Sequence, residues 1–149
     1  MSFRIPLRLK RYLFAIISRV GMATYRRFPV FGSLRASLAV IRDADRILVI
    51  DRSDGRGLSF PGGLAFFWET PEQALVREVS EETGLGVKWS APLFSYYASD
   101  ELPCTITVFA AEAEGELRDS WEGSPNWLTM NDIRPALIKS QREIVGRLA

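Results

Sequence analysis

The chain has 149 residues, of which 47% are hydrophobic and 25% are charged, so it is long and apolar enough to fold as one globular domain. A single cysteine excludes an internal disulfide framework and a zinc site built of cysteines, and the absence of histidine excludes every mechanism that depends on an imidazole. Any catalysis must therefore use carboxylates, a metal ion, lysine or arginine.

Charge is distributed unevenly along the chain. Residues 1–42 carry nine lysines and arginines and no acidic residue. The other 107 residues carry ten basic and all eighteen acidic side chains, which gives them a net charge of −8. The sequence thus joins a basic leader to an acidic body, two regions of opposite electrostatic character.

The leader is predicted to form an amphipathic helix from about Ile5 to Val20, with Gly21 as its end. The apolar residues recur every three or four positions, and they are Leu9, Tyr12, Leu13, Ile16, Ile17 and Val20. A secretory signal is disfavoured, because the apolar stretch is short and is interrupted at Arg19.

The apolar stripe of this leader must be covered, because it would otherwise expose a large hydrophobic patch. Three covers are available: the protein's own domain, a second subunit, or an anionic membrane surface. The nine cations of residues 1–42 face a body of net charge −8, which favours docking onto protein, in the same chain or a homodimer, over the membrane. We expect residues 1–30 to be a basic helical extension and residues 31–149 to form the main domain.

The rest of the chain alternates between strand and helix patterns. Apolar and β-branched runs predict strands at Leu34–Ile41, Arg46–Arg52, Leu58–Phe60, Lys88–Tyr97, Thr105–Glu112 and Asn126–Leu128. The segment Asp43–Asp45 predicts a hairpin between the first two strands. A C-terminal helix is predicted, with Asn131 or Asp132 as its cap and its clearest part over Ser140–Leu148. This order predicts an α/β (α+β) fold, a sandwich of mixed strands and helices in one domain.

A helix over Pro71–Glu82 has the strongest boundary signals in the chain. Thr70 is the predicted N-cap, and Gln73 completes a capping box with it. The proline at the first helical position and Gly84 just after the last turn are typical of a helix start and a helix end.

Three glutamates on this helix form an acidic cluster. Glu78, Glu81 and Glu82 are spaced i, i+3 and i+4, so their carboxylates lie on one helix face. The negative end of the helix dipole lies close by, which costs each carboxylate about 0.3–1 kcal/mol in addition to their mutual repulsion. One interpretation is a solvated acidic surface. The other is a site for a hard divalent cation, Mg²⁺ or Mn²⁺, which takes oxygen ligands and bridges to substrate phosphates.

The spacing around this cluster favours the second interpretation. Gly63 is followed after five residues by Glu69 and, after seven more, by the run Arg77-Glu78-Val79-Ser80-Glu81-Glu82-Thr83-Gly84-Leu85. Seven fixed residue types and two aliphatic positions would match by chance on the order of 10⁻⁹ times per register. This stretch resembles the signature of the Nudix hydrolase family, Gly-x5-Glu-x7-Arg-Glu-U-x-Glu-Glu-x-Gly-U, in which U is a bulky aliphatic residue.

The resemblance implies a fold, a cofactor and roles for particular residues. The fold would be a mixed β-sheet sandwiched between helices, here with an extra N-terminal helix, and the cofactor would be Mg²⁺ or Mn²⁺. The metal would be held by one backbone carbonyl and three carboxylates, those of Gly63, Glu78, Glu81 and Glu82. Arg77 would orient this catalytic cluster through an ion pair with Glu69. The usual substrates of the family are nucleoside diphosphates linked to another group.

Residues outside the metal cluster would bind substrate and complete the chemistry. The general base would be Glu78 or an acid from a later loop, Glu101 or Glu122, since no histidine is present. Substrate would be bound by residues that precede, follow or lie inside the motif: Arg52, Arg56, Phe67 and Glu122. Each also has a simpler interpretation, because polar loop residues are commonly solvated and apolar loop residues commonly pack against the core.

The leading hypothesis is a cytoplasmic, Mg²⁺-dependent Nudix hydrolase that cleaves the diphosphate bridge of a nucleoside diphosphate derivative, such as ADP-ribose or an ADP-sugar. Two alternatives are a pyrophosphohydrolase that removes damaged nucleoside triphosphates and a catalytically quiet domain that senses a ligand. The complete carboxylate set argues against the quiet domain. Nucleic-acid binding is not expected, because the basic leader contains no recognition motif.

Overall fold

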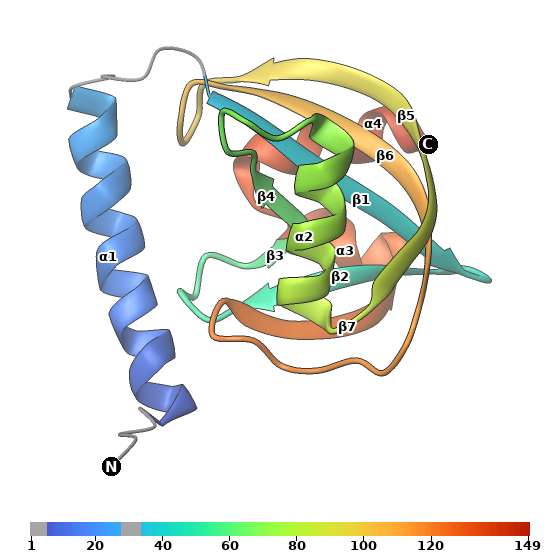
Figure 1. The fold of residues 1–149 in the computed structure, drawn as a ribbon, viewed down its shortest axis with the longest axis horizontal. Helices are drawn as coiled ribbons and strands as arrows, with labels where there is room; N and C mark the ends of the chain where they lie inside the picture. The colour runs from blue at the N-terminus through green and yellow to red at the C-terminus, as the bar shows by residue number, and fades with distance from the viewer. Residues whose placement is uncertain (1–5, 28–33) are drawn as a thin grey trace.

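The computed structural model describes residues 6–27 and 34–149, and within these ranges seven strands form one mixed sheet. The strand order is β3-β2-β1-β6-β5, with β4 paired to β1 and β7 paired to β2 (Figure 1). β1 and β6 run parallel, and the other strand pairs are antiparallel. The strands are β1 (Leu34–Asp43), β2 (Arg46–Arg52), β3 (Leu58–Ser59), β4 (Gly62–Leu64), β5 (Gly86–Ala98), β6 (Cys104–Glu114) and β7 (Gly123–Thr129).

Helices cover both faces of this sheet, as predicted. One face carries α2 and the other carries three short elements (Figure 1), and the bounds are α2 (Pro71–Thr83), α3 (Met130–Ala136), the 3-10 turn η1 (Lys139–Gln141) and α4 (Arg142–Leu148). Residues 36–41 of β1 are all buried, whichever face they point to, and all but Ser37 are apolar. Leu75 and Val79 of α2 belong to one buried cluster, whereas Ile133 of α3 and Ile144 of α4 belong to the other.

The boundaries of α2 agree closely with the prediction. The Thr70 side chain accepts the Gln73 backbone N–H at 3.2 Å, and the Gln73 side chain accepts the Thr70 N–H at 3.0 Å, which confirms the capping box. Gly84 ends the helix with a φ of 80°, a conformation in which other residues are strained. Because both ends of α2 are fixed, the glutamates of its last turns are held beside β4.

The N-terminal helix is longer than predicted. α1 spans Leu7–Arg27, so the prediction that Gly21 ends the helix is wrong. Gly21 is exposed, and a β-carbon there would meet no atom within 4 Å. The glycine therefore weakens the helix by about 1 kcal/mol without ending it. Ile5, the predicted first residue, lies outside the described residues.

The predicted C-terminal helix is two helices. Thr129 is the N-cap of α3, and its side chain accepts the Asp132 N–H, so the prediction of Asn131 or Asp132 as the cap is wrong. Between α3 and α4 the backbone is extended at Leu137, which pairs with Leu58 of β3. Both leucines are buried. Burial against a strand distant in sequence thus interrupts the helical pattern, and local sequence signals do not reveal such a contact.

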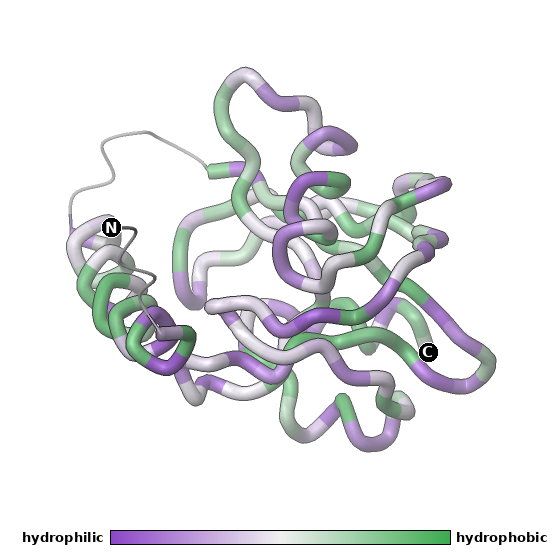
Figure 2. Tube along the Cα trace, turned by 60° about the horizontal axis from the view of Figure 1, so that its bottom comes forward, coloured by the Kyte–Doolittle hydropathy of each residue, from purple (hydrophilic) through white to green (hydrophobic). Residues whose placement is uncertain are grey.

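α1 lies alongside the domain and contacts it through a partly polar face (Figure 1). Arg11 donates to the carbonyls of Ser120 and Gly123 at 3.2 and 3.3 Å, and the Phe14 ring packs edge-on against Trp121 with 4.8 Å between centroids. Figure 2 shows hydrophobic and hydrophilic residues alternating along this helix. The expected docking of the apolar stripe onto its own domain is not observed. The loop that faces α1 presents the carbonyl groups of Ser120 and Gly123, which accept hydrogen bonds from the Arg11 guanidinium. An aliphatic side chain has no donor for these groups.

Candidate active site

Two glutamates of α2 are buried beside the glycine turn that precedes the helix. Glu78 is 9% exposed and Glu82 is 4% exposed. The Gly62 N–H donates to Glu82 Oε2 at 2.8 Å. A β-carbon on Gly63 would lie 2.8 Å from the Glu78 carboxyl carbon, so a larger residue would displace that carboxyl. The two glycines therefore form a cradle for both carboxyl groups.

Arg77 links this cluster to the loop before α2. Its guanidinium donates to Glu69 Oε1 at 2.7 Å, to Glu78 Oε1 at 2.8 Å and to the Leu64 carbonyl at 3.0 Å. Glu81 accepts a longer bond of 3.3 Å from the same group and stays exposed. Arg77 is thus positioned to orient Glu78 through a network that also contains Glu69.

A third carboxyl, from Glu122 in the loop before β7, lies next to the first two. Burial and the adjacent Glu122 carboxyl raise the pKa of Glu82 well above its ordinary value. Burial also raises the pKa of Glu78 to about 7, although Arg77 acts in the opposite direction. Ionisation of Glu78 and Glu82 is therefore unfavourable without a cation, and a bound cation would favour it.

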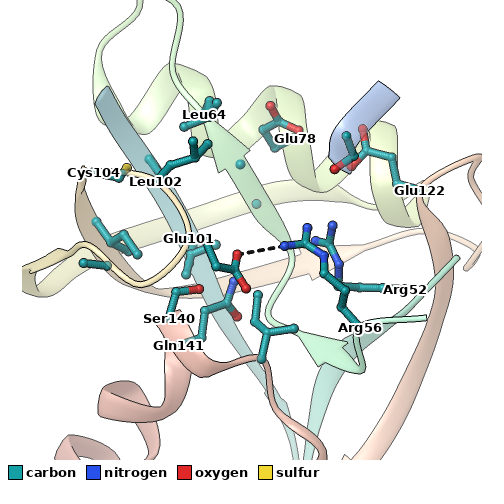
Figure 3. Close-up of a pocket in the computed structure, with 18 of the residues that line it drawn as sticks. Arg52, Arg56, Leu64, Glu78, Glu101, Leu102, Cys104, Glu122, Ser140 and Gln141 are labelled. Atoms are coloured by element: carbon teal, nitrogen blue, oxygen red, sulfur yellow. Dashed lines mark ion pairs between the residues drawn. The ribbon is translucent and has the colours of Figure 1, made fainter. Parts of the chain in front are cut away.

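Glu78 and Glu122 lie on one side of a cavity of about 320 Å³ (Figure 3), and Glu82 also lines it. This volume is at the lower end of the usual range for ligand pockets, about 300–1,000 Å³. Arg52 and Arg56 project into the same cavity, and Glu101 enters it from the loop between β5 and β6. Much of the remaining lining is apolar: Ala36, Leu38, Leu64, Leu102, Ile106 and Ile138. An anionic side, a cationic side and an apolar lining suit a charged ligand with an organic group attached.

Asp54 fixes the two arginines in place. Its fully buried side chain accepts from Arg52 Nη2 at 2.6 Å and from Arg56 Nε at 2.8 Å. Burial opposes ionisation of Asp54, but the two arginines outweigh it and hold the pKa of this carboxyl well below its ordinary value. Arg56 also pairs with Glu101 at 3.1 Å, the dashed contact in Figure 3. Both arginines are therefore ordered before any ligand binds.

α1 forms part of the cavity wall, a contribution that the sequence alone did not predict. Phe14, Ser18 and Met22 line the cavity, and Arg56 Nη1 donates to the Met22 sulfur at 3.4 Å. The spacing i, i+4 and i+8 indicates that the three residues share a helix face. It does not indicate which surface that face meets, because this depends on contacts with residues a hundred positions away.

Four of the predicted site residues lie outside the cavity lining, namely Phe67, Glu69, Arg77 and Glu81. Phe67 is 88% exposed, and its ring packs edge-on against Trp68 at 4.7 Å between centroids. The other predicted residues lie around the cavity, and they are Arg52, Arg56, Gly63, Glu78, Glu82 and Glu122. The motif and the two loops that flank it in sequence are thus brought together in space.

The donor set fits a hard divalent cation. Carboxylate and carbonyl oxygens are the ligands that Mg²⁺ and Mn²⁺ prefer. The Gly62 N–H and Arg77 engage one oxygen each of Glu82 and Glu78. Within residues 6–27 and 34–149, no group of three or more acidic, histidine or cysteine side chains is arranged to hold a metal ion by itself. Water and substrate oxygens would therefore complete the coordination, as is usual for Mg²⁺.

Comparison with known proteins places this site in a family, because the NUDIX domain matches residues 32–148. The chain belongs to the Nudix family. A MutT-like protein of Streptomyces ambofaciens is 32% identical over 107 residues, which cover 70% of this chain and 69% of that protein. An ADP-ribose pyrophosphatase of Methanocaldococcus jannaschii is 36% identical over 100 residues, which cover 63% of this chain and 56% of that protein.

Solved structures share the fold of this Nudix protein. A putative Nudix hydrolase from Chromobacterium violaceum has a TM-score of 0.67 and 26% identity, over 79% of this chain and 77% of that chain. A MutT Nudix hydrolase from Burkholderia pseudomallei has a TM-score of 0.70 and 22% identity, over 78% of this chain and 98% of that chain, which is a likeness of fold alone. The protein is an enzyme, a Nudix pyrophosphohydrolase, and α1 lies outside the matched residues.

Proposed function

We propose that this Nudix hydrolase cleaves the phosphoanhydride bridge of a nucleoside diphosphate joined to a second group, with Mg²⁺ or Mn²⁺ as cofactor. The observation that carries the proposal is the presence of Glu78, Glu82 and Glu122 in one cavity with Arg52 and Arg56. The carboxylates would hold the cation, and the arginines would bind phosphate oxygens. ADP-ribose and ADP-sugars have this chemistry, and one relative is an ADP-ribose pyrophosphatase.

A bound cation would neutralise phosphate charge and lower the pKa of a water molecule. The protein's own groups orient the substrate and move the proton. Arg52 and Arg56, held by Asp54, would fix the bridging phosphates against the acidic side of the cavity. Glu78 and Glu122 face the cavity and can each accept the proton of the attacking water. Glu101 is the weaker candidate base, because its carboxyl already pairs with Arg56.

A hydrolysis assay with the full chain tests this proposal. With ADP-ribose or an ADP-sugar and Mg²⁺ we expect a nucleoside monophosphate and a sugar phosphate, separated by chromatography. Orthophosphate should appear only after a phosphatase is added. Direct release of orthophosphate would contradict cleavage at the bridge. Absence of turnover with both Mg²⁺ and Mn²⁺ would contradict the assigned substrate class.

A second candidate is hydrolysis of damaged nucleoside triphosphates, which the MutT-like relative favours. In that case a nucleoside triphosphate would yield a monophosphate and pyrophosphate. The same assay with normal and oxidised triphosphates separates the two functions by kcat/KM. We expect kcat/KM to be at least about tenfold higher for the diphosphate derivatives, because one favourable contact provides discrimination of this size. A domain that only senses a ligand would bind these compounds in calorimetry without converting them.

A further inference from the structure

The outward face of α1 is an apolar surface that no described residue covers. This outer stripe consists of Leu9, Ile16 and Val20, whose side chains are 44 to 60% exposed, while Leu13 and Ile17 on its flank line a recess beside Trp121. At 3.6 residues per turn, Leu9, Ile16 and Val20 point roughly opposite to the face that lines the cavity. The stripe is therefore free for a partner while the inner face of α1 stays on the domain.

Cations border the outer stripe. Arg8 and Lys10 near the start of α1 and Arg27 at its end are all exposed, and the helix contains no aspartate or glutamate. A partner that covers the stripe must therefore present apolar groups together with negative charge. Pairing with α1 of a second copy would bring cations against cations, which disfavours a symmetric dimer through this face.

We propose that α1 binds the surface of an anionic lipid bilayer, lying in the plane of the interface with the outer stripe among the acyl chains and the cations among the headgroups. No described helix is long and apolar enough to cross a membrane. A basic amphipathic helix of 21 residues, about 32 Å long, is typical of interfacial binding. Residues 43–149 have a net charge of −8, so the same surface repels the body and confines contact to α1.

Contacts on the inner face keep α1 attached to the domain during such binding. Arg11 donates to the Ser120 and Gly123 carbonyls and pairs with Asp119 at 3.4 Å. The cavity wall on the inner face then lies about one helix diameter, about 10 Å, from the lipid. The two faces of one helix thus meet different partners, a substrate on the inside and a membrane on the outside.

Co-sedimentation of the full chain with lipid vesicles tests the proposal. We expect binding to vesicles that contain phosphatidylglycerol, weaker binding to pure phosphatidylcholine, and loss of binding in high salt. The variant L9Q/I16Q/V20Q should bind anionic vesicles at least about tenfold more weakly, because it removes apolar groups from the stripe alone. The matched control V76Q/L93Q/L117Q removes exposed apolar residues elsewhere and should bind as the wild type does.

A second pair of variants tests the charge requirement. R8Q/K10Q should weaken binding to phosphatidylglycerol vesicles by about thirtyfold, from about 1 kcal/mol for each of the two cations near the surface, whereas the exposed control pair R42Q/R134Q should not. Turnover of a soluble substrate should be unchanged in all four variants. This measurement shows, without lipid, that each variant is folded. Equal binding of L9Q/I16Q/V20Q and wild type would overturn the proposal. The proposal would also be overturned if the wild type did not bind vesicles but formed a dimer that L9Q/I16Q/V20Q abolished.

Discussion

At the scale of single residues, the buried carboxylate of Asp54 determines where both arginines of the cavity lie. Asp54→Asn keeps the shape of the side chain but removes the charge that partners Arg52 and Arg56. We expect a loss of about 3 kcal/mol in the free energy of unfolding, the usual effect of leaving a buried ion pair without one partner. Denaturant unfolding at pH 7 measures it. Asp43→Asn is the matched control, because Asp43 forms an exposed ion pair worth at most about 1 kcal/mol.

The pKa of Asp54 also predicts a pH dependence of stability. The pKa is lower in the folded protein than the ordinary value of about 3.9, so folding favours the ionised form. The contribution of Asp54 is therefore complete above about pH 4 and is lost as the pH falls further. We expect the difference in unfolding free energy between the wild type and Asp54→Asn to shrink from pH 5 to pH 2. A difference that stays constant over this range would contradict the ion-pair assignment.

Unlike Asp54, the buried carboxyls of Glu78 and Glu82 are expected to contribute to catalysis and not to stability. Glu78→Gln and Glu82→Gln should each lower kcat by at least about 100-fold, as loss of a metal ligand or a base does. Because each substitution removes a charge from a buried, mutually repelling group, the melting temperature without metal should be unchanged or higher. Glu72→Gln, at an exposed position on the same helix, is the control. Turnover equal to that of the control would refute the assignment of the site.

At the scale of elements, sequence signals correctly predicted the helix ends that depend on interactions between neighbouring residues. The cap at Thr70 and the stop at Gly84 act within one helix, and the prediction of α2 agrees with the structure to one residue at its end. The split between α3 and α4 results from burial of Leu137 against β3, a contact made across most of the chain. The same limit applies to the site. The motif predicted Glu78 and Glu82, whereas the place of Phe14 and Met22 in the cavity wall depends on how the chain folds back.

The contribution of α1 to the cavity gives a test at this scale. Phe14→Ala and Met22→Ala each remove part of the cavity wall, and neither changes the carboxyls of the site or Asp54, the partner of the two arginines. If the inner face of α1 contacts substrate, KM should rise by about tenfold, with kcat changed by less than about threefold, because the lost contact is made equally in ground and transition states. Ile16→Ala on the outer stripe is the control. Unchanged KM in both variants would mean that α1 covers the cavity without contacting the substrate.

At the scale of the whole molecule, the buried core lies in the domain and not at its contact with α1. Both buried clusters are built from β1 and the strands and helices after it, and neither contains a residue of α1. The described contacts of α1 with the domain include hydrogen bonds from Arg11, the ion pair of Arg11 with Asp119 and the packing of Phe14 against Trp121. We therefore expect the Nudix domain to fold without the basic helix, which adds a cavity wall and an outward apolar surface.

Deleting residues 1–30 tests this division. We expect the truncated chain to fold with a melting temperature lowered by a few degrees, about 4 °C for each kcal/mol of lost surface contact in a domain of this size. KM should rise by about tenfold, since the inner face of α1 no longer closes the cavity, while kcat with Mg²⁺ stays within about threefold. Calorimetry and steady-state kinetics measure the two effects, and Arg11→Ala should give a smaller change in the same direction. Loss of all turnover at saturating substrate in a folded truncated chain would contradict the division, because it would place α1 in the chemistry itself.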